Sequence, residues 1–408
     1  MGKMHLMSVQ YKKSSFLGKI KKMKISDLLS DYKNIEKEIV KLNKYLYDNP
    51  ELGYEEIKSS TKIKSFLKEH KIVNNFKEFN DIPTAFVGSL NNKKGKNIAI
   101  CIEYDALPEI GHACGHNLIT SMGVGAMYLL SKFKEKLNSE ILIVGCPAEE
   151  IIPLTFENGG GGGKIKLLKK GVFDDTIAAM MIHPATRNEV DPLMIAVKQI
   201  DIEFIGKSAH ASGSPYVGRN ALDAQILSYN AISVLRQQLK STEKIHGIIT
   251  SGGVSPNIIP DYTRSSWMIR AQKTSELKKL EKKVINCFES AGKSTGCEIN
   301  MIEGNGTYEN LVTDKKLANI FIKKSEELSI DMKTNEYYDQ SKNGSTDFGN
   351  ISKQIPSLHA FLAVVPDDGK IVNHQPEFTE ATIKPAAIEA IKNGSVLLAS
   401  TVLELDSL

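Results

Sequence analysis

Asn97-Ile-Ala-Ile-Cys-Ile102 and Ile141-Leu-Ile-Val-Gly-Cys146 are two continuous apolar runs of strand length. Runs of this kind are typical of strands that a sheet buries on both faces. Helical patterns over Asn117–Lys136 and Lys164–Lys170 alternate with them, and another apolar run follows at Thr176–Ile182. This alternation predicts an α/β fold whose sheet is mostly parallel and flanked by helices.

The middle of the chain has a different pattern, and a chain of 408 residues is long enough for two domains. After about Val197 we expect a half-buried strand at Asp201–Ile205, a helix over Asn220–Leu239, strands near 246–252 and 262–270, and a helix over Ser275–Ala291. The α/β pattern then resumes with a helix from about Thr313 to Leu328, a strand at Ser357–Val364 and a closing helix over Glu380–Leu403. We therefore predict an N-terminal tail at 1–25, a first domain from 26–196 and 311–408, and an inserted α+β domain at 197–310.

Helices are expected at the start of the first domain. Ser26 is a suitable N-cap for a helix that Asn49-Pro50 would end. Its apolar residues recur every three or four positions, at Leu28, Leu29, Tyr32, Ile35, Ile39, Leu42 and Leu46. A second helix over about Glu55–Glu69 precedes a short strand around Thr84–Leu90.

Composition and charge narrow the class of function. The net charge of +4 is small, and much of the basic excess lies in Lys12–Lys24, so a nucleic-acid partner is not expected. No run of about 18 apolar residues occurs, and the N-terminus lacks the apolar core of a signal peptide, which argues against membrane spanning and secretion. The five cysteines form no C-x-x-C pair and no disulfide framework. We expect a cytoplasmic globular protein with reduced thiols.

Potential metal ligands follow several predicted strands. His112-Ala-Cys-Gly-His116 lies in a strand-to-helix loop, Pro147-Ala-Glu-Glu150 and His183-Pro184 come at strand ends, and Asn373-His374 lies in a loop near the C-terminus. Such ends gather at one edge of a parallel sheet, and these donors suit zinc, manganese or similar divalent ions. Of two adjacent glutamates, one can bind a metal while the other faces a metal-activated water. Taken alone, the glutamate pair could also be a solvated acidic turn.

At this point the sequence resembles family twenty of the metallopeptidases, in its amidohydrolase branch. That branch includes aminobenzoyl-glutamate hydrolases, auxin-conjugate hydrolases and β-alanyl-lysine type dipeptidases. The resemblance runs from about residue 30 to the end and is carried by Asp105-Ala-Leu-Pro108, His112–His116, Pro147–Glu150, His183-Pro184, Ser208-Ala-His-Ala-Ser212 and Asn373-His374. It implies a zinc-peptidase-like catalytic domain with an inserted ferredoxin-like domain that serves as a lid and in dimerisation.

The resemblance also implies roles for individual residues. Cys114, His116, Glu150, His183 and His374 would be metal ligands, and Glu149 the general base. Five protein ligands fit two zinc or manganese ions that share a bridging ligand better than one tetrahedral ion. The implied reaction is hydrolysis of an amide bond in a dipeptide or N-acyl amino acid, with Glu149 taking the proton of a metal-activated water and passing it to the leaving amine.

Residues of the inserted domain would complete the site. On sequence alone His210 is best interpreted as a packed or capping histidine, whereas the resemblance implies that it reaches the active site of a partner subunit and stabilises the reaction intermediate. We therefore expect a homodimer. Asn257, in a lid segment, and Arg270, a possible carboxylate clamp, would contact substrate. Each could also be an ordinary turn residue or surface charge.

The chain departs from the branch pattern in several places. Asn117 stands where the branch usually has aspartate, and Glu103-Tyr104-Asp105 stands where other family members carry His-x-Asp. We expect Asp105 to hold a ligand rather than the metal. The stretch Thr155–Lys164 looks most like the β-alanyl-lysine dipeptidase members, and Ser345-Thr-Asp-Phe348 resembles the Ser-Glu-Asp-Phe of the family.

Other functions fit less well. A phosphate-binding loop is not expected from the glycine run, because Asn158 and Ile165 occupy positions that need glycine and a hydroxyl residue. A non-catalytic binding protein on the same fold would be expected to have lost Glu149 or a ligand. An N-carbamoyl amino acid hydrolase normally has His and Asp in place of the His112–His116 motif. Dipeptide, N-acyl amino acid and aminobenzoyl-glutamate all remain open as substrates.

Overall fold

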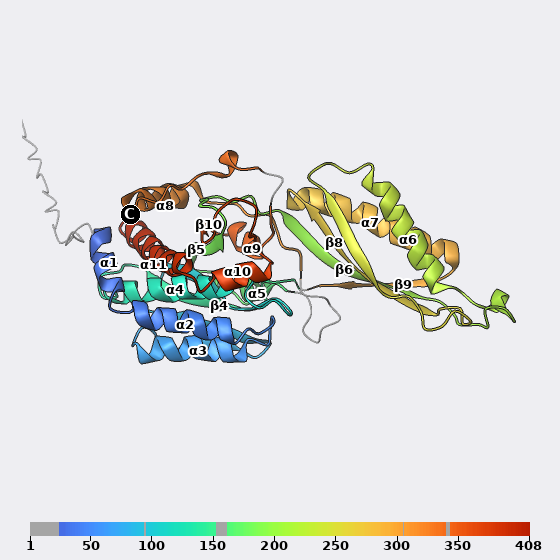
Figure 1. The fold of residues 1–408 in the computed structure, drawn as a ribbon, viewed down its shortest axis with the longest axis horizontal. Helices are drawn as coiled ribbons and strands as arrows, with labels where there is room; N and C mark the ends of the chain where they lie inside the picture. The colour runs from blue at the N-terminus through green and yellow to red at the C-terminus, as the bar shows by residue number, and fades with distance from the viewer. Residues whose placement is uncertain (1–23, 94, 152–160, 305, 340–342) are drawn as a thin grey trace, which may run out of the picture.

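The computed structural model describes residues 24–93, 95–151, 161–304, 306–339 and 343–408. These residues form two lobes, each built on its own β-sheet (Figure 1). The larger lobe has a six-stranded sheet in the order β1-β2-β4-β3-β5-β10, and the smaller lobe a four-stranded sheet in the order β7-β8-β6-β9. Of the tail predicted at residues 1–25, residues 1–23 lie outside the described residues, as does most of the glycine run. Ile25, placed in the tail by the prediction, is instead the buried first residue of a helix.

The larger sheet is parallel at its centre. Its strands are β1 (Phe76–Phe79), β2 (Ile82–Ser89), β3 (Asn97–Glu103), β4 (Glu140–Cys146), β5 (Thr176–Ala185) and β10 (Ser357–Ala363). β4, β3, β5 and β10 run parallel, while β1 and β2 are antiparallel additions at one edge. The continuous apolar runs that predicted β3 and β4 are buried along almost their whole length, as expected of strands covered on both faces.

Helices cover both faces of this sheet. They are α1 (Ile25–Tyr32), α2 (Glu36–Asp48), α3 (Ile57–Glu69), α4 (His116–Ser131), α5 (Gly163–Lys169), α8 (Lys315–Glu327), α9 (Phe348–Ser352), α10 (Pro376–Ala381) and α11 (Pro385–Asp406). α4 packs along α11 and over β3 and β5, and α5 and α9 contact each other on the second apolar core. Among the described helices, α11 alone is long and apolar enough to cross a membrane. Of its most apolar stretch of 18 residues, 67% is buried within the molecule, as in a core helix.

Two predicted helices are each divided in the structure. The first is interrupted at residues 33–35, where Asn34 N–H donates to Asp31 and Ile35 N–H to Tyr32 in short-range bonds of a tight turn. Lys24, not Ser26, occupies the N-cap position. The closing helix is divided into α10 and α11, because Pro385 begins α11 as a residue suited to the first helical turn.

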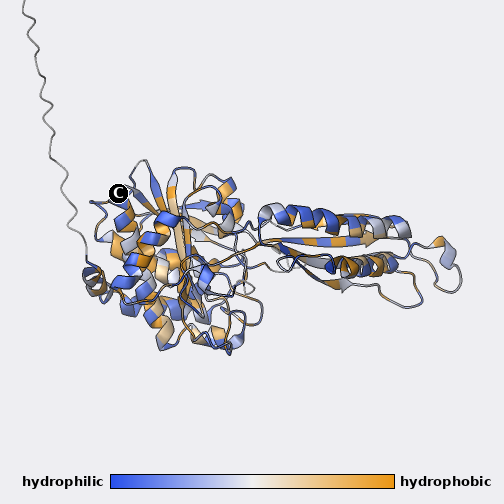
Figure 2. Ribbon diagram, turned by 90° about the horizontal axis from the view of Figure 1, so that it is seen from above, coloured by the Kyte–Doolittle hydropathy of each residue, from blue (hydrophilic) through white to orange (hydrophobic). Residues whose placement is uncertain are grey.

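The smaller lobe is the predicted α+β unit. It contains β6 (Ala196–Ile205), β7 (Lys244–Ser251), β8 (Tyr262–Ala271) and β9 (Glu298–Glu303), with the short η1 (Pro215–Val217) and the helices α6 (Ala221–Arg236) and α7 (Thr274–Thr295). All of its strand pairs are antiparallel. Burial alternates along β8, as in a sheet with one covered face. Figure 2 shows the lobe extending away from the larger one, with apolar and polar residues alternating along its helices and strands.

Candidate metal-dependent active site

Donor side chains from four segments meet at the carboxyl edge of the parallel strands. Cys114 lies in the loop between β3 and α4, and His116 begins α4. Glu149 and Glu150 follow β4, and His183 lies near the end of β5. His374 comes from the loop between β10 and α10. Because parallel strands end at the same edge of a sheet, these residues converge although they span more than half of the chain.

A glycine turn brings Cys114 against His183. Gly115 has φ +83°, and a Cβ there would lie 2.4 Å from a ring carbon of Pro184, so only glycine fits this close approach. Cys114 Sγ lies 3.3 Å from His183 Nε2. The other ring nitrogen of His183 lies 2.7 Å from its neighbouring carbonyl at Pro184 and donates to it. The imidazole is therefore fixed with Nε2 turned toward the thiol.

Asp105 orients two of the other donors. Its Oδ1 lies 2.9 Å from His116 Nδ1, and its Oδ2 accepts a 2.9 Å hydrogen bond from the backbone N–H of Glu150. A carboxylate acceptor fixes the His116 proton on Nδ1, so Nε2 is turned toward the other donors. Within the described residues His116 Nε2 is buried and makes no hydrogen bond. Asp105 thus lies behind the donor set, not among its open atoms.

Adjacent glutamates have different surroundings. Ala148 has φ +51°, and its N–H donates a 2.8 Å hydrogen bond to the buried carboxylate of Glu56. This left-handed residue turns the chain just before Glu149 and Glu150. Burial, reinforced by the charge of Glu103, raises the pKa of Glu149 well above its usual range. Burial also opposes ionisation of Glu150, but its contact with His374 lowers the pKa of that carboxyl.

Two groups of open donor atoms share Cys114. Cys114, His116 and His183 form one group and Cys114, Glu150 and His374 the other, with all donor atoms of a group within 4.8 Å of one another. His374 Nε2 lies 3.4 Å from Glu150 Oε1. Sulfur, imidazole and carboxylate ligands suit zinc and related divalent ions, and buried donors without hydrogen-bond partners are what a bound cation would satisfy. The residues present therefore fit divalent metal.

A cavity of about 620 Å³ opens beside these donors. Its described lining includes Arg270 and Lys244 from the smaller lobe and Ser345 from the larger one. Arg270 Nη1 donates a 3.0 Å hydrogen bond to Ser345 Oγ. Arg270 thus lies where the two lobes meet, close enough to the donors for a small molecule to contact both.

His210 and Asn257 lie outside this cavity. Both follow the ends of β6 and β7 that point away from the larger lobe, where Ile205 pairs with Tyr262 (Figure 1). Arg270 lies at the other end of the same ladder, and the ten residues of β6 span roughly 30 Å. His210 is exposed, and its Nδ1 accepts a 2.9 Å hydrogen bond from Gly213 N–H. Within one chain the structure does not bring these two predicted site residues to the donors.

Several residues around the donors were not predicted from the sequence. Tyr308, from the loop after β9, is buried and donates a 2.8 Å hydrogen bond to the carbonyl of Glu149. His359 stacks on His183 with ring centroids 5.7 Å apart, and burial together with His183 lowers its pKa to about 3. Lys164 is fully buried in the first turn of α5. Only Lys164 carried a signal, because it directly follows the glycine run.

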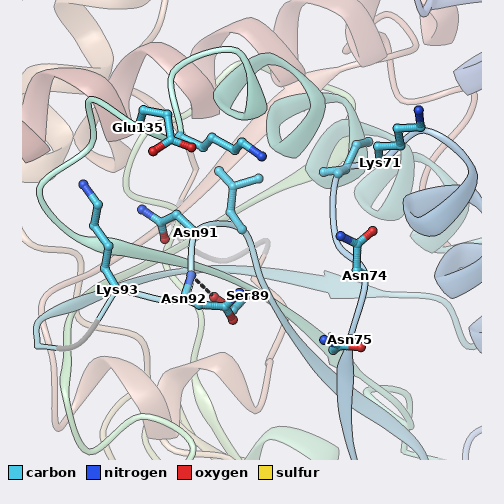
Figure 3. Close-up of a pocket in the computed structure, with 11 residues that line it drawn as sticks. Lys71, Asn74, Asn75, Ser89, Asn91, Asn92, Lys93 and Glu135 are labelled. Carbon is cyan, nitrogen blue, oxygen red and sulfur yellow. Dashed lines mark hydrogen bonds between the residues drawn. The ribbon is translucent and has the colours of Figure 1, made fainter.

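A second, smaller hollow of about 190 Å³ lies at the opposite edge of the larger sheet (Figure 3). It is lined by amide and lysine side chains such as Asn74, Asn91 and Lys93, with Glu135 as the one carboxylate of its described lining. Ser89, beside it, pairs with Leu142 near the start of β4, whereas the donors follow the other end of that strand. Its described lining offers no imidazole or thiol, and the hollow is separate from the donor cluster.

A set of thiol, imidazole and carboxylate donors at the carboxyl edge of this sheet, open to a cavity and with a further glutamate beside it, defines a metal-dependent hydrolase of peptide or amide bonds. Residues 100–400 match the model of Peptidase family M20/M25/M40, and the chain belongs to this family. The family predicted from the sequence motifs is thereby confirmed.

Relatives of known activity support this assignment. The chain is 34% identical over 376 residues to an Xaa-Arg dipeptidase of Mus musculus, covering 89% of this chain and 84% of the relative. It is 31% identical over 271 residues to one of the subunits of the p-aminobenzoyl-glutamate hydrolase of Escherichia coli, covering 61% of this chain and 54% of the relative. A dinuclear metal-binding peptidase of Bacillus subtilis has the same fold, with a TM-score of 0.64 and 20% identity over 91% of this chain and 99% of that one.

Proposed function

We propose that this protein is a dipeptidase or N-acyl amino acid hydrolase that uses two divalent ions, zinc or manganese. The observation that carries the proposal is the pair of donor groups sharing Cys114, with Glu149 beside them. We assign Cys114, His116, Glu150, His183 and His374 as metal ligands. Of these, Cys114 would serve both sets of ligands, because it alone belongs to both groups.

The charge of the site supports a pair of cations. Five buried carboxylates lie in and around the donor set. Among the described residues, the buried ammonium next to them is that of Lys164, which contacts two of these carboxylates. The carboxylates belong to Glu103, Asp105, Glu149, Glu150 and Asp347. Fully ionised, these groups would carry far more negative charge than one ammonium can compensate, which is costly in a buried environment. Divalent ions would offset that charge.

Glu149 is assigned as the general base. Bound metal would supply Lewis-acid chemistry at this site, polarising the substrate carbonyl and making a water acidic enough to be deprotonated near neutral pH. The Glu149 carboxylate lies 3.9 Å from His116 Nε2, so it is beside the donor cluster while Glu150 is engaged by His374. Glu149 would take the proton of the attacking water and return it to the leaving amine.

Arg270 is proposed to anchor the substrate. Its guanidinium borders the cavity and donates to Ser345 from Nη1, to His246 from Nε and to the Met268 sulfur from Nη2. Each of the two amino groups still has a second N–H for a carboxylate. A C-terminal carboxylate bound there would place the amide bond of a dipeptide toward the donors. The similarity to Xaa-Arg dipeptidase makes dipeptides with a basic C-terminal residue the first substrates to test.

We further propose a homodimer in which His210 and Asn257 act on the partner subunit's site. Neither can reach the cavity of its own chain across roughly 30 Å of sheet. β7 is an edge strand of the smaller sheet, and its Ile248 and Ile249 are 62% and 42% exposed. An apolar unpaired edge is a template for strand pairing with another chain. The cytoplasmic location expected from the sequence remains a prediction.

The metal-dependent reaction is tested by stripping the protein with chelator and adding back manganese, zinc or cobalt. We expect amine release from Xaa-Arg and Xaa-Lys dipeptides to be lost and then restored. N-acyl amino acids, aminobenzoyl-glutamate and N-carbamoyl amino acids complete the panel. Cleavage confined to N-carbamoyl substrates would assign a carbamoyl hydrolase instead. No turnover on any substrate, with metal demonstrably bound, would favour a binding protein.

A further inference from the structure

A buried row of charges connects the donor cluster with α5 and α9. Glu103, the last residue of β3, is fully buried, and its Oε1 lies 2.6 Å from Lys164 Nζ. Lys164 Nζ also contacts Asp347, which precedes α9. On the far side of Glu103, Oε2 lies 3.4 Å from His116 Nε2. The row therefore runs from Asp347 through Lys164 and Glu103 to an atom assigned above as a metal ligand.

The contact between Glu103 Oε2 and His116 Nε2 has no hydrogen-bond donor when the imidazole is neutral. Asp105 fixes the His116 proton on Nδ1, so a neutral imidazole turns the lone pair of Nε2 toward a carboxylate oxygen. Two acceptors in contact repel each other unless a proton or a metal ion lies between them. Neither Glu103 Oε2 nor His116 Nε2 makes a hydrogen bond within the described residues, and both are fully buried.

The distance is the one that a shared ion requires. Zinc–oxygen and zinc–nitrogen bonds of about 2.0–2.2 Å at a tetrahedral angle separate two ligand atoms by about 3.4 Å. Glu103 Oε2 and His116 Nε2 are 3.4 Å apart, close to the 3.3 Å between Cys114 Sγ and His183 Nε2. Glu103, His116 and Glu149 also form a buried group whose donor atoms lie within 4.8 Å of one another.

Lys164 is held firmly enough to fix the Glu103 carboxylate. Its backbone N–H donates a 2.8 Å hydrogen bond to one carboxylate oxygen of Asp347, and its Nζ contacts the other oxygen. Asp347 therefore binds both the backbone and the side-chain end of Lys164. The preceding residue must be glycine, because a Cβ on Gly163 would lie 1.9 Å from the carbonyl oxygen of Pro147. Lys164 Nζ therefore lies between the carboxylates of Asp347 and Glu103, with its backbone fixed by Asp347.

We propose that Glu103 is a further ligand of the ion that His116 would hold, and that Lys164, bound by Asp347, is the residue that positions the Glu103 carboxylate. The proposal rests on the metal-binding function proposed above and adds a residue that the motifs do not assign. Lys164 takes one carboxylate oxygen and thereby leaves the other for the ion. Without the ammonium, the carboxylate would be free to turn away from His116.

The test is a cobalt titration of the metal-free full-length protein, followed by visible absorption and by competition with a chelator. Glu103→Gln keeps the shape of the side chain but weakens it as a ligand. We expect one of two bound equivalents to lose on the order of 10- to 100-fold in affinity, with altered cobalt absorption, while the other is unchanged. Wild-type affinity for both equivalents together with a wild-type spectrum would overturn the proposal.

Further variants separate ligation from folding. Lys164→Met should weaken the same equivalent and Lys164→Arg should largely restore it, whereas a purely structural lysine would leave the cobalt spectrum unchanged. Asp201→Asn is the matched control, because Asp201 is a fully buried carboxylate paired with Arg264 in the smaller lobe. If Glu103→Gln does not fold, Glu103→Asp, which draws the carboxylate back, decides the question. A wild-type protein that binds no cobalt would contradict the proposed function itself.

Discussion

Glu149 and Glu150 are neighbours in the chain with different contacts. Glu150 has its N–H on Asp105 and its carboxylate 3.4 Å from His374, whereas Glu149 is held through its carbonyl by Tyr308. Glu149→Gln should therefore lower kcat by about 10²- to 10⁴-fold, the usual contribution of a general base, and leave metal content as in wild type. Turnover and bound metal per chain are measured on the same preparation.

Glu150→Ala is the matched control for this prediction. It removes a donor from the group with Cys114 and His374, so it should lower both metal content and turnover. Equal metal loss in the two variants would show that the two carboxylates do not have separate roles.

At the residue scale, the donors at strand ends could be predicted from the sequence, because apolar strands and the residues after them are visible in it. Glu103 and Lys164 could not be placed together in this way. Their contact depends on how α5 packs against the sheet, and Lys164 meets Asp347 across 183 positions of sequence. No periodic pattern records such a contact. Tyr308 was missed for the same reason.

At the scale of elements, apolar spacing predicts which face of a helix is buried better than where the helix stops. Leu28, Tyr32, Ile35 and Ile39 are all buried as predicted, although the chain turns between α1 and α2. The spacing continues through the turn, so it gives no sign of the break. β9 was not predicted, because the strand has only six residues and lies at the edge of the sheet, where none of them is fully buried.

The edge strand β7 gives a prediction at the same scale. Ile248→Lys places a charge on the exposed edge that we assign to the dimer, where its burial without a partner is unfavourable. We expect the dimer dissociation constant to rise at least tenfold, or by about 1.4 kcal/mol, in sedimentation experiments. Ile57→Lys is the control, since Ile57 is 66% exposed on α3 of the larger lobe. An unchanged dissociation constant in Ile248→Lys would remove β7 from the interface.

At the scale of the whole molecule, the length of the smaller lobe decides how the site is completed. The lobe carries Arg270 at the end of its sheet near the donors and His210 beyond the opposite end. If His210 takes part in the reaction, it must do so in another subunit. A two-fold dimer would then contain two sites, each with Glu149 from one chain and His210 from the other.

This arrangement predicts that two inactive variants restore each other. His210→Ala and Glu149→Gln homodimers should both turn over slowly while binding metal normally. In a mixed dimer, the site in the His210→Ala chain combines its intact Glu149 with His210 of the partner subunit. The second site lacks both the Glu149 carboxylate and the His210 imidazole. After subunit exchange at equal concentrations, half of the dimers are mixed, so activity should recover to about a quarter of wild type. No recovery, with exchange verified by differently tagged chains, would mean that His210 does not act across the dimer, and a fully active His210→Ala protein would exclude it from the reaction.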